Sequence, residues 1–450
     1  METIKVGNQT VRAVAGAQRY DPERNYRFSR HCLEVDCPDG RLLYHSLSGE
    51  LLLLQKTEST ADPTLREELT KRGFLVPLEF HDRQHCDQVR TVTRLTQKNS
   101  GAITDYVVFT TTDCNARCYY CFEKGQRRLT MREQTARDAA NWMLAHAKGE
   151  KIKIRWFGGE PLYNAGVIDV ISRMLRDGGA AYESTMVTNA YLFEPRLIEK
   201  AVKLWNLRQV LVTVDGTEAV YNRTKAFIHQ DGSAYRRVLS NLERLLEAGI
   251  AITVNLNMDA HNAEDLFDLA EELGRRFGGE KGFAARCELL VEYAGKLASF
   301  ESDRQALDAR RAVNERLESF GIRRKATVEQ GLKLNSCMAD DPHSVTILPD
   351  GRIGRCEHFG DSEEVGSIYH EAWDPEKLAA WREPRPTEEA CEDCVLYPQC
   401  YRLKKCNACP DRCNFLFREQ RIGNLQDKVR NTWARWKQKQ SLQAGGEHED

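Results

Sequence analysis

The chain has 450 residues, 41% hydrophobic and 29% charged, which is the composition of a globular protein long enough for more than one domain. Its 65 lysines and arginines nearly balance 67 aspartates and glutamates, which excludes a global positive field that would attract nucleic acid or an anionic membrane. The first residues lack the pattern of a signal peptide, and the longest apolar run, Leu51–Leu54, is too short to span a membrane. We therefore expect a cytoplasmic protein without nucleic-acid or membrane partners.

The first 95 residues predict a small α+β unit. A hairpin is expected about Pro38, Asp39 and Gly40, where turn residues separate two segments of strand-like pattern. Residues 48–55 (SGELLLLQ) and 64–73 (TLREELTKRG) are both predicted to be short helices, and the glycine at the end of the second is its expected C-cap.

Between about residues 103 and 291, short β-branched runs alternate with longer segments of helical pattern. This alternation predicts repeated βα units around a parallel sheet, in a right-handed and barrel-like arrangement. The predicted helices include 132–147 and 235–249, the second closed by a glycine. The predicted strands are 103–110, 151–157, 184–188, 209–214, 251–258 and 283–292.

Each of the first five predicted strands is followed by residues suited to ligand binding. A cysteine triplet follows the first strand, GGEP (158–161) the second and TN (188–189) the third. DG (215–216) follows the fourth strand and NMD (257–259) the fifth. Because the carboxyl ends of parallel strands form one face of a sheet or barrel, we expect these loops to meet in a single cofactor pocket.

The cysteines favour metal or redox chemistry. The chain has fifteen of them, and a reducing cytoplasm disfavours disulfides. Cys114, Cys118 and Cys121 share one loop with the spacing C-x3-C-x2-C. A closed zinc site needs four ligands, whereas three thiolates can hold three irons of a [4Fe–4S] cluster and leave the fourth iron open. Four isolated cysteines are interpreted as ordinary small thiols: Cys32, Cys37, Cys86 and Cys287.

With this triplet, the sequence resembles the radical S-adenosylmethionine (SAM) superfamily, in which such a loop follows the first strand of a partial (β/α)6 barrel. The resemblance implies that SAM chelates the open iron and that one electron cleaves SAM to a 5′-deoxyadenosyl radical, which abstracts a substrate hydrogen. It also implies an electron donor such as flavodoxin or ferredoxin. The alternative interpretation of the triplet alone is a metal loop without this chemistry.

The resemblance extends to the other strand-end loops and implies which residues contact SAM. Tyr120 occupies the aromatic position near adenine, and Glu160 supplies an acceptor for the methionine ammonium. Relatives commonly have the sequence Thr-Asn-Gly after the third strand. This chain has Ala190 in place of the glycine, a departure expected to restrict the turn. The implied cofactor-binding residues are Tyr120, Gly158, Gly159, Glu160, Pro161, Thr188, Asn189, Asp215, Arg223 and Asn257.

Eight further cysteines lie between residues 337 and 413, and two interpretations compete for them. The two C-x2-C pairs, 391/394 and 406/409, would suit a zinc ribbon, but four cysteines then stay unexplained. Alternatively, eight thiolates fill two four-cysteine [4Fe–4S] sites, which with the first cluster makes three. The metal ligands are then Cys337, Cys356, Cys391, Cys394, Cys400, Cys406, Cys409 and Cys413.

The second interpretation is supported by a resemblance to the SPASM extension of peptide-modifying radical enzymes. That pattern begins with a cysteine, then Gly-x-Cys, then C-x2-C-x5-C, as at 337, 354–356 and 391–400. The chain departs from it at Lys404, so the division of ligands between the two clusters stays open. By analogy, Cys337 and Cys356 belong to the first auxiliary cluster, and the cysteines of 391–400 to the second.

Glu357 directly follows a cysteine of this pattern. Some relatives with the extension carry an acidic general base at that position, and a carboxylate there could accept the proton of a reacting thiol or hydroxyl. We therefore predict Glu357 as the catalytic residue. The alternative is that Glu357 and His358 only form hydrogen bonds with nearby backbone.

These observations predict an α/β protein of five regions. They are a winged-helix-like leader-recognition domain (1–95), a radical SAM partial barrel (100–298), a helical linker (299–335), a SPASM domain with the auxiliary clusters (336–418), and a C-terminal helix (419–450) whose last ten residues are disordered. The first region is expected to bind a leader as an added strand on a sheet edge, or else to be a scaffold that completes the barrel.

The predicted function is modification of a ribosomally made precursor peptide that carries a leader. The expected product is a thioether between a cysteine and a carbon of another residue. Two alternatives use the same chemistry: carbon–carbon crosslinking, and oxidation of a sulfatase cysteine or serine to formylglycine. A more distant alternative is a non-enzymatic interaction protein stapled by zinc.

Overall fold

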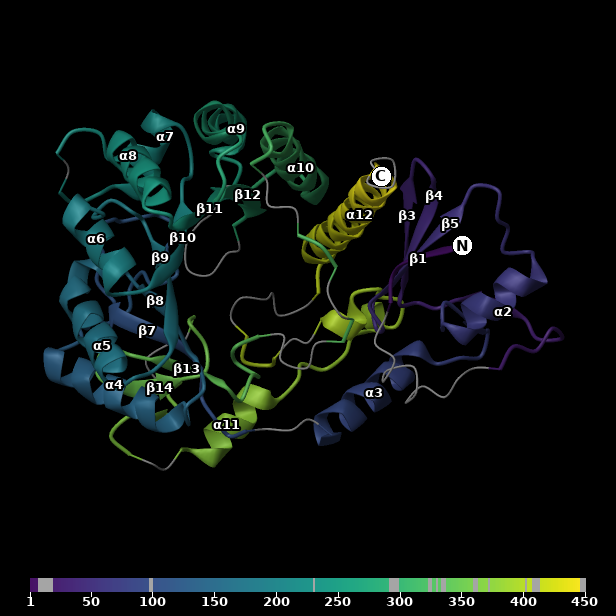
Figure 1. Ribbon diagram of the computed structural model, residues 1–450, viewed down its shortest axis with the longest axis horizontal. Coiled ribbons are helices and arrows are strands. Elements are labelled where there is room, and N and C mark those ends of the chain that lie inside the picture. Colours follow the sequence, from purple (N-terminus) through teal and green to yellow (C-terminus); the bar gives the residue numbers. More distant parts are fainter. Residues whose placement is uncertain are drawn as a thin grey trace.

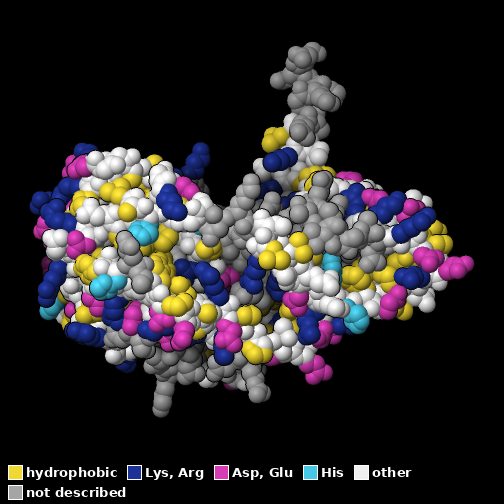
Figure 2. Space-filling view, turned by 90° about the horizontal axis from the view of Figure 1, so that it is seen from below, with side chains coloured by type: hydrophobic (Ala, Val, Ile, Leu, Met, Phe, Trp, Pro, Cys, Tyr) yellow, Lys and Arg dark blue, Asp and Glu magenta, His cyan; other side chains and the backbone are white. Residues whose placement is uncertain are grey.

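The computed structural model describes residues 1–6, 19–96, 100–229, 231–290, 299–322, 326–328, 331–332, 337–358, 363–370, 373–400, 403–406 and 413–445. A large α/β unit lies at the left of Figure 1 and a small α+β unit at the right, with the C-terminal segment and its long helix α12 (Phe415–Gly445) between them. Figure 2 shows the same two lobes from below. In the described part of the chain, no helix is long and apolar enough to cross a membrane.

The large unit contains a nine-stranded sheet with the order β12-β11-β10-β9-β8-β7-β13-β14-β15. Strands β7 to β12 are mutually parallel and follow the chain order, which confirms the predicted βα units. The sheet is open, with β12 and β15 at its edges, so the barrel is partial. The elements are β7 (Asp105–Thr111), α4 (Glu133–His146), β8 (Ile152–Gly158), α5 (Ala165–Asp177), β9 (Tyr182–Thr188), α6 (Pro195–Lys203), β10 (Leu207–Thr213), α7 (Glu218–Lys225), α8 (Ala234–Glu247), β11 (Ala251–Met258), α9 (Ala263–Phe277), β12 (Phe283–Leu289), α10 (Asp303–Ser319), β13 (Ser344–Ile347), β14 (Arg352–Gly354) and β15 (Gly366–Ser367).

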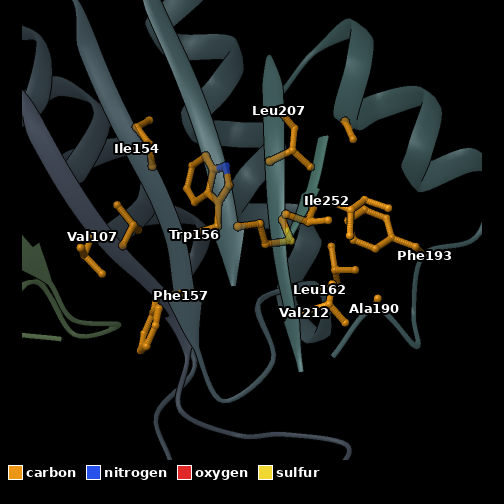
Figure 3. Packing of buried hydrophobic residues seen from close by; sticks show 14 of the residues in the cluster. Val107, Ile154, Trp156, Phe157, Leu162, Ala190, Phe193, Leu207, Val212 and Ile252 are labelled. Atoms are coloured by element: carbon orange, nitrogen blue, oxygen red, sulfur yellow. The ribbon is translucent and has the colours of Figure 1, made fainter. Parts of the chain in front are cut away.

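The main core lies between one face of this sheet and its helices. Trp156 of β8, Val212 of β10 and Ile252 of β11 are buried there, within one apolar cluster (Figure 3). Burial of side chains of this size contributes about 1.5–3 kcal/mol each. Side chains alternate along a strand, so the neighbouring positions face the other side of the sheet, where Arg155 of β8 pairs in register with Thr185 of β9.

The small unit contains an antiparallel sheet of order β1-β5-β4-β3, which is followed along the chain by two helices. The predicted hairpin is confirmed, since β3 and β4 pair from Cys32 with His45 to Cys37 with Gly40. The predicted helix at 64–73 is also confirmed as α2, and Gly73 beyond it has a φ of 79°. The elements are β1 (Glu2–Lys5), β2 (Tyr26–Phe28), β3 (Cys32–Cys37), β4 (Gly40–His45), β5 (Glu50–Gln55), α2 (Pro63–Lys71), β6 (Leu75–Pro77) and α3 (Asp82–Thr96).

The helix predicted for residues 48–55 is wrong, because this segment forms β5. The strand lies between β1 and β4, and both of its faces are covered. Leu51 and Leu53 pack in the cluster that includes residues of α12, whereas Leu52 and Leu54 pack toward α2 and β6. A strand buried on both faces has a continuous apolar run instead of an alternating one, and such a run cannot be distinguished from a buried helix by pattern alone.

The C-terminal segment also departs from the prediction. Helix α12 continues to Gly445, so residues 441–445, predicted as the start of a disordered tail, are helical. The rest of that predicted tail, 446–450, lies outside the described residues. Before α12, the cysteine-rich segment contains the short helix α11 (Pro375–Arg382) and single 3-10 turns at 389–391 and 397–399.

Candidate functional site

The cysteine loop begins directly after β7, at the carboxyl edge of the parallel sheet. Cys114, Cys118 and Cys121 are all half-buried. Burial, together with the charges of Glu160 and of the other two thiols, raises the pKa of Cys114 to about 12. Burial likewise raises the pKa of Cys121 to about 11. The three thiols therefore lie near one another in a poorly solvated place, where proton loss requires a nearby positive charge such as that of iron.

The residues around the thiols suit the cluster that the resemblance implies. The backbone N–H of Ala116 donates to Cys114 Sγ at 3.3 Å, and such hydrogen bonds to sulfur tune iron–sulfur clusters. Within the described ranges, no three His, Cys, Asp or Glu side chains are grouped so that they could hold a single metal ion. Three neighbouring thiols with an N–H donor to sulfur are a donor set appropriate to a cluster of several irons.

The glycines of GGEP pack the end of β8 against the cysteine loop. A Cβ at Gly158, which has a φ of 114°, would lie 2.0 Å from the carbonyl oxygen of Thr111. A Cβ at Gly159 would lie 2.3 Å from the carbonyl oxygen of Asp113. Both glycines are therefore required by backbone packing beside the cysteines, a role separate from the cofactor contact that the sequence predicts for them.

Glu160 joins the second strand-end loop to the third. Its buried carboxylate accepts hydrogen bonds from Leu162 N at 3.1 Å, Thr188 Oγ1 at 2.8 Å and Asn189 N at 2.8 Å. Burial raises the pKa of Glu160 to about 7, against the opposite influence of these three donors. Pro161 begins the 3-10 turn that places the Leu162 donor. The structure thus brings three predicted site residues into direct contact.

Asn189 extends this connection to the cysteine loop. Its Nδ2 donates to Asn115 Oδ1 at 2.7 Å and lies 3.9 Å from Cys114 Sγ. The next residue, Ala190, has a φ of 60°, in the left-handed region that glycine adopts more easily. The presence of alanine where relatives have glycine therefore gives a strained turn, which costs about 1–2 kcal/mol.

A buried ion pair lies on the other side of the cysteine loop. Asp215 Oδ2 accepts a hydrogen bond from Tyr120 Oη at 2.5 Å and is 2.6 Å from Lys225 Nζ. Lys225 also donates to Tyr120 Oη at 2.8 Å, and the backbone N–H of Asn257 donates to Asp215 Oδ1 at 3.2 Å. Burial opposes the charge of Lys225, but the surrounding groups, first Asp215 and then Tyr120 and Cys118, together raise the pKa of the lysine well above its usual range. The positive charge of Lys225 in turn favours the thiolate of Cys118.

Lys225 is a site residue that sequence reasoning missed. Arg223 was predicted instead, and the structure leaves it exposed on α7, outside this network. A signal was present in the sequence: Tyr221 and Lys225 are spaced i, i+4 on the buried face of α7, and Arg223 is on another face. The carbonyl of Lys225 also accepts a hydrogen bond from Arg117 N at 2.8 Å, which ties the end of α7 to the cysteine loop.

The described C-terminal cysteines form two groups. Burial raises the pKa of Cys394, and the charges of Cys400, Cys413 and Cys391 raise it further, so these four thiols are neighbours. We call them the second set. Burial likewise raises the pKa of Cys356 to about 12, with contributions from Cys337, Glu357 and Cys406. We call Cys337, Cys356 and Cys406 the first set. Cys409 lies outside the described residues.

The first set approaches the cysteine loop of the sheet. Glu357, the predicted general base, is 3.1 Å from Arg155 Nη1 of β8. The ring of His358 lies 4.5 Å from that of Phe122, the residue after Cys121, in an edge-on arrangement. Residues next to two groups of cysteines, more than 200 residues apart in sequence, are thus in direct contact, and Glu357 is paired with the middle of β8.

Comparison with known proteins agrees with this geometry. Residues 108–273 match the family model described as the Radical SAM superfamily, whose members use SAM and a [4Fe–4S] cluster. This part of the chain is therefore similar to the radical SAM superfamily. GTP 3′,8-cyclase of Clostridium perfringens is 23% identical over 276 residues, 58% of this chain and 82% of the relative. The radical SAM cyclopropyl synthase TigE of Paramaledivibacter caminithermalis is 25% identical over 179 residues, 35% of this chain and 37% of the relative.

Two solved structures share the fold at low sequence identity. The enzyme anSMEcpe with bound AdoMet has a TM-score of 0.54 and 13% identity, over 74% of this chain and 94% of that one. SuiB of Streptococcus suis bound to S-adenosylmethionine has a TM-score of 0.51 and 14% identity, over 83% and 94%. Other structures hold anSMEcpe with the Cp18Cys peptide and SuiB with its precursor peptide SuiA.

Proposed function

We propose that this chain is a radical SAM enzyme that modifies a ribosomally made precursor peptide with the help of two auxiliary [4Fe–4S] clusters. The contact between Phe122 and His358 carries the proposal, because it joins the radical site to a second group of metal-ligating thiols. A peptide bound at this edge of the sheet would lie between the two. When bound, SAM and the clusters supply the radical that removes a substrate hydrogen and an acceptor for the electron left after bond formation.

The chain provides ligands for three clusters in this proposal. Cys114, Cys118 and Cys121 would hold the cluster that binds SAM. The first set, with Cys409 as a further candidate, would hold one auxiliary cluster, and the second set would hold the other. This division supports the earlier assignment by analogy and adds Cys406 to the first auxiliary cluster and Cys413 to the second.

Glu357 is the proposed general base for thioether formation. Its carboxylate is about a quarter exposed, so it remains accessible to a substrate while it is paired with Arg155. A carboxylate at this place could accept a proton from a cysteine thiol of the peptide. Arg155, which is paired with this carboxylate at 3.1 Å, is the proposed positioning residue for Glu357.

A peptide is the substrate class that the structural neighbours favour, since both anSMEcpe and SuiB have been solved with peptides. The small N-terminal unit supports a leader in addition. Strands β1 and β3 are the edges of its four-stranded sheet, and an edge strand can accept an extended peptide as an additional strand. We therefore propose residues 1–95 as the leader-binding region.

The test is a reaction of the reconstituted protein with a candidate cysteine-containing precursor peptide, SAM and a low-potential reductant. The proposal predicts a mass loss of two hydrogens for each bond formed, together with one substrate thiol per bond that no longer reacts with iodoacetamide. SAM cleavage without any mass change in peptides of this class would contradict it. Colourless protein that contains zinc and no acid-labile sulfide would do so too, in favour of the zinc-stapled interaction protein.

A second candidate function is formation of a carbon–carbon bond in the peptide. The similarity to TigE, named a cyclopropyl synthase, favours it. The mass loss would again be two hydrogens per bond, but every substrate cysteine would still react with iodoacetamide. The same experiment therefore separates the two products.

A further inference from the structure

The segment that carries most of the second set packs against the N-terminal unit. Tyr397 lies between Cys394 and Cys400 and is only 7% exposed. Its ring stacks on that of His31 with the centroids 6.3 Å apart, and the guanidinium of Arg90 lies 4.8 Å from the ring centroid on Tyr397. The side chain is therefore inserted into a site made by α3 and by His31, which directly precedes β3, far from its own segment in sequence.

Polar contacts of Tyr397 make this insertion specific. Its hydroxyl donates to Asp87 Oδ1 at 2.7 Å. Arg90 Nη2 donates to the carbonyl oxygens of Tyr397 at 2.5 Å and Pro398 at 3.0 Å. Ser46 Oγ donates to the carbonyl of Val395 at 2.6 Å. Val395, Tyr397 and Pro398 of the cysteine segment thus obtain backbone or side-chain partners from the N-terminal unit.

One face of α3 provides most of these partners. Arg83, Cys86, Asp87 and Arg90 have the spacing i, i+3, i+4, i+7 of a single helical face. Arg83 forms an ion pair with Glu392, which lies between two cysteines of the second set. Arg83 and Arg90 therefore place two positive charges against the cysteine segment.

The thiols themselves take part in the cores of the N-terminal unit. Cys394 and Cys400 pack against the cluster that contains Leu33 and Leu53, and Cys391 packs with Cys394 against the cluster around Cys86. Helix α12 begins two residues after Cys413, and its residues 425 and 429 pack against the four-stranded sheet, in the cluster that contains Leu33 and Leu53. The N-terminal unit therefore contacts three of the four cysteines directly and holds the chain that follows the fourth.

We propose that the N-terminal unit is a structural part of the second cysteine centre, and that Tyr397 is the residue that positions this centre. The inference rests on the proposed function only in naming iron as the occupant. The N-terminal unit then has a second role: besides any leader binding, residues 1–95 form a wall of an auxiliary metal site. Deletion of residues 1–95 would then remove that centre as well as the leader contact.

The first test measures access to the thiols, without any requirement for turnover. The full-length chain, before cluster reconstitution, is treated anaerobically with iodoacetamide, and labelling of Cys394 and Cys400 is followed by mass spectrometry. Tyr397→Ala should increase their labelling rates about tenfold, because the segment loses its buried anchor, while Cys118 in the radical SAM domain is unchanged. Tyr106→Phe is the matched control, since Tyr106 is another buried tyrosine whose hydroxyl donates a hydrogen bond, to Ile103 O at 2.6 Å, but lies in the large sheet.

Wild-type labelling rates in Tyr397→Ala would overturn the proposal. Faster labelling of Cys118 as well would indicate global unfolding, and Tyr397→Phe then decides the question, since it retains the ring and loses only the bond to Asp87. That variant should show an intermediate increase that is not additive with Asp87→Ala, because the two changes remove the same hydrogen bond. Additive effects would contradict the role of this contact.

The second test measures iron after anaerobic reconstitution. Tyr397→Ala should lose about four irons relative to wild type, and Tyr106→Phe should lose none. Equal iron in wild type and Tyr397→Ala, with the second set fully liganded, would overturn the inference and leave the proposed function intact. If wild type holds only the iron of the radical SAM cluster, the proposed function fails, whereas the labelling experiment still decides whether Tyr397 positions the cysteine segment.

Discussion

The two cysteine regions of this protein are held by different means. The triplet at the end of β7 is surrounded by its own domain. Strand-end loops of the same parallel sheet provide Glu160 and Asp215, and helix α7 provides Lys225; all three are buried and hydrogen-bonded. The second set lies in a segment of turns and short helices, and it takes its supporting contacts from the N-terminal unit. One centre is built into a sheet, and the other is assembled between separate parts of the chain.

This difference has consequences for stability and reactivity. Damage to the first site requires a change within the sheet domain, where Glu160, Asp215 and Lys225 are held by hydrogen bonds. The second site can be weakened from the N-terminal unit, at residues that touch no cofactor. Changes in the first site should therefore reduce SAM cleavage, and changes in the C-terminal sites should reduce peptide modification while SAM cleavage continues.

The largest effect is expected from Cys118→Ala. Its thiol is one of three on the loop, and a cluster with two ligands from this loop would not be retained. We expect SAM cleavage to fall to the background rate, as measured by release of 5′-deoxyadenosine with dithionite as reductant. Cys287→Ala, a buried cysteine in β12 away from the loop, is the control and should retain cleavage. Cleavage at the wild-type rate in Cys118→Ala would refute the assignment of the triplet.

A change at Glu357 should separate the two reactions. Glu357→Gln removes the proposed base but keeps the size of the side chain, so peptide modification should slow by about 10²-fold or more. Release of 5′-deoxyadenosine without peptide should stay within about twofold of wild type, since the residue is outside the network around Tyr120 and Asp215. Equal losses in both reactions would contradict this division of roles.

Lys225 tests how far the first site depends on its buried ion pair. Lys225→Met leaves the charge of Asp215 buried without its cation, which should reduce the free energy of unfolding by about 3–5 kcal/mol. Arg223→Ala, on an exposed face of the same helix, should change it by no more than about 0.5 kcal/mol. Both values come from urea unfolding of the full chain. A similar small change in both variants would show that the pair is not structural.

Glu160 should give the chain a specific pH dependence. Because burial raises its folded-state pKa to about 7 from the ordinary 4.5, the folded chain binds more protons than the unfolded chain between these values. The contribution of Glu160 to the free energy of unfolding therefore decreases by up to about 3 kcal/mol as the pH rises from about 4.5 to 7, and it stays constant at higher pH. Glu160→Gln should lack this decrease when unfolding is measured from pH 5 to 8. A variant with the wild-type slope would contradict the assignment.

The smallest effect is expected at Ala190. Substitution by glycine relieves the left-handed backbone but removes a buried methyl group and increases the freedom of the unfolded chain. The opposing contributions are similar in size, so Ala190→Gly should change the free energy of unfolding by less than about 1 kcal/mol. A loss of several kcal/mol would show that the methyl group has a packing role that outweighs the strain.

Much of the first site could be predicted from the sequence because parallel strands place their following loops on one edge. Glu160, Thr188 and Asn189 meet for that reason alone, although they come from two different loops. Lys225 was missed because the basic residue was selected by its place in a motif and not by the buried face of α7. The run at Leu51–Leu54 was misassigned because burial on both faces removes the alternation that identifies a strand.

The second site could not be predicted to the same extent. The spacing of the C-terminal cysteines does not predict which of them lie together. Their grouping depends on how the folded chain brings Cys406 near Cys356 and Cys413 near Cys394. The insertion of Tyr397 beside His31 is a contact across more than 360 residues. No local propensity encodes such a contact, which depends on the packing of two separately formed units.

The central claim is that one chain holds one open cluster and two auxiliary clusters. The most direct test is the amount of iron and acid-labile sulfide per chain after anaerobic reconstitution, in wild type and in a Cys114→Ala, Cys118→Ala, Cys121→Ala variant. Our account predicts about twelve irons in wild type and about eight in the variant, with sulfide in equal amounts. About four irons together with zinc in wild type, and almost none in the variant, would contradict it.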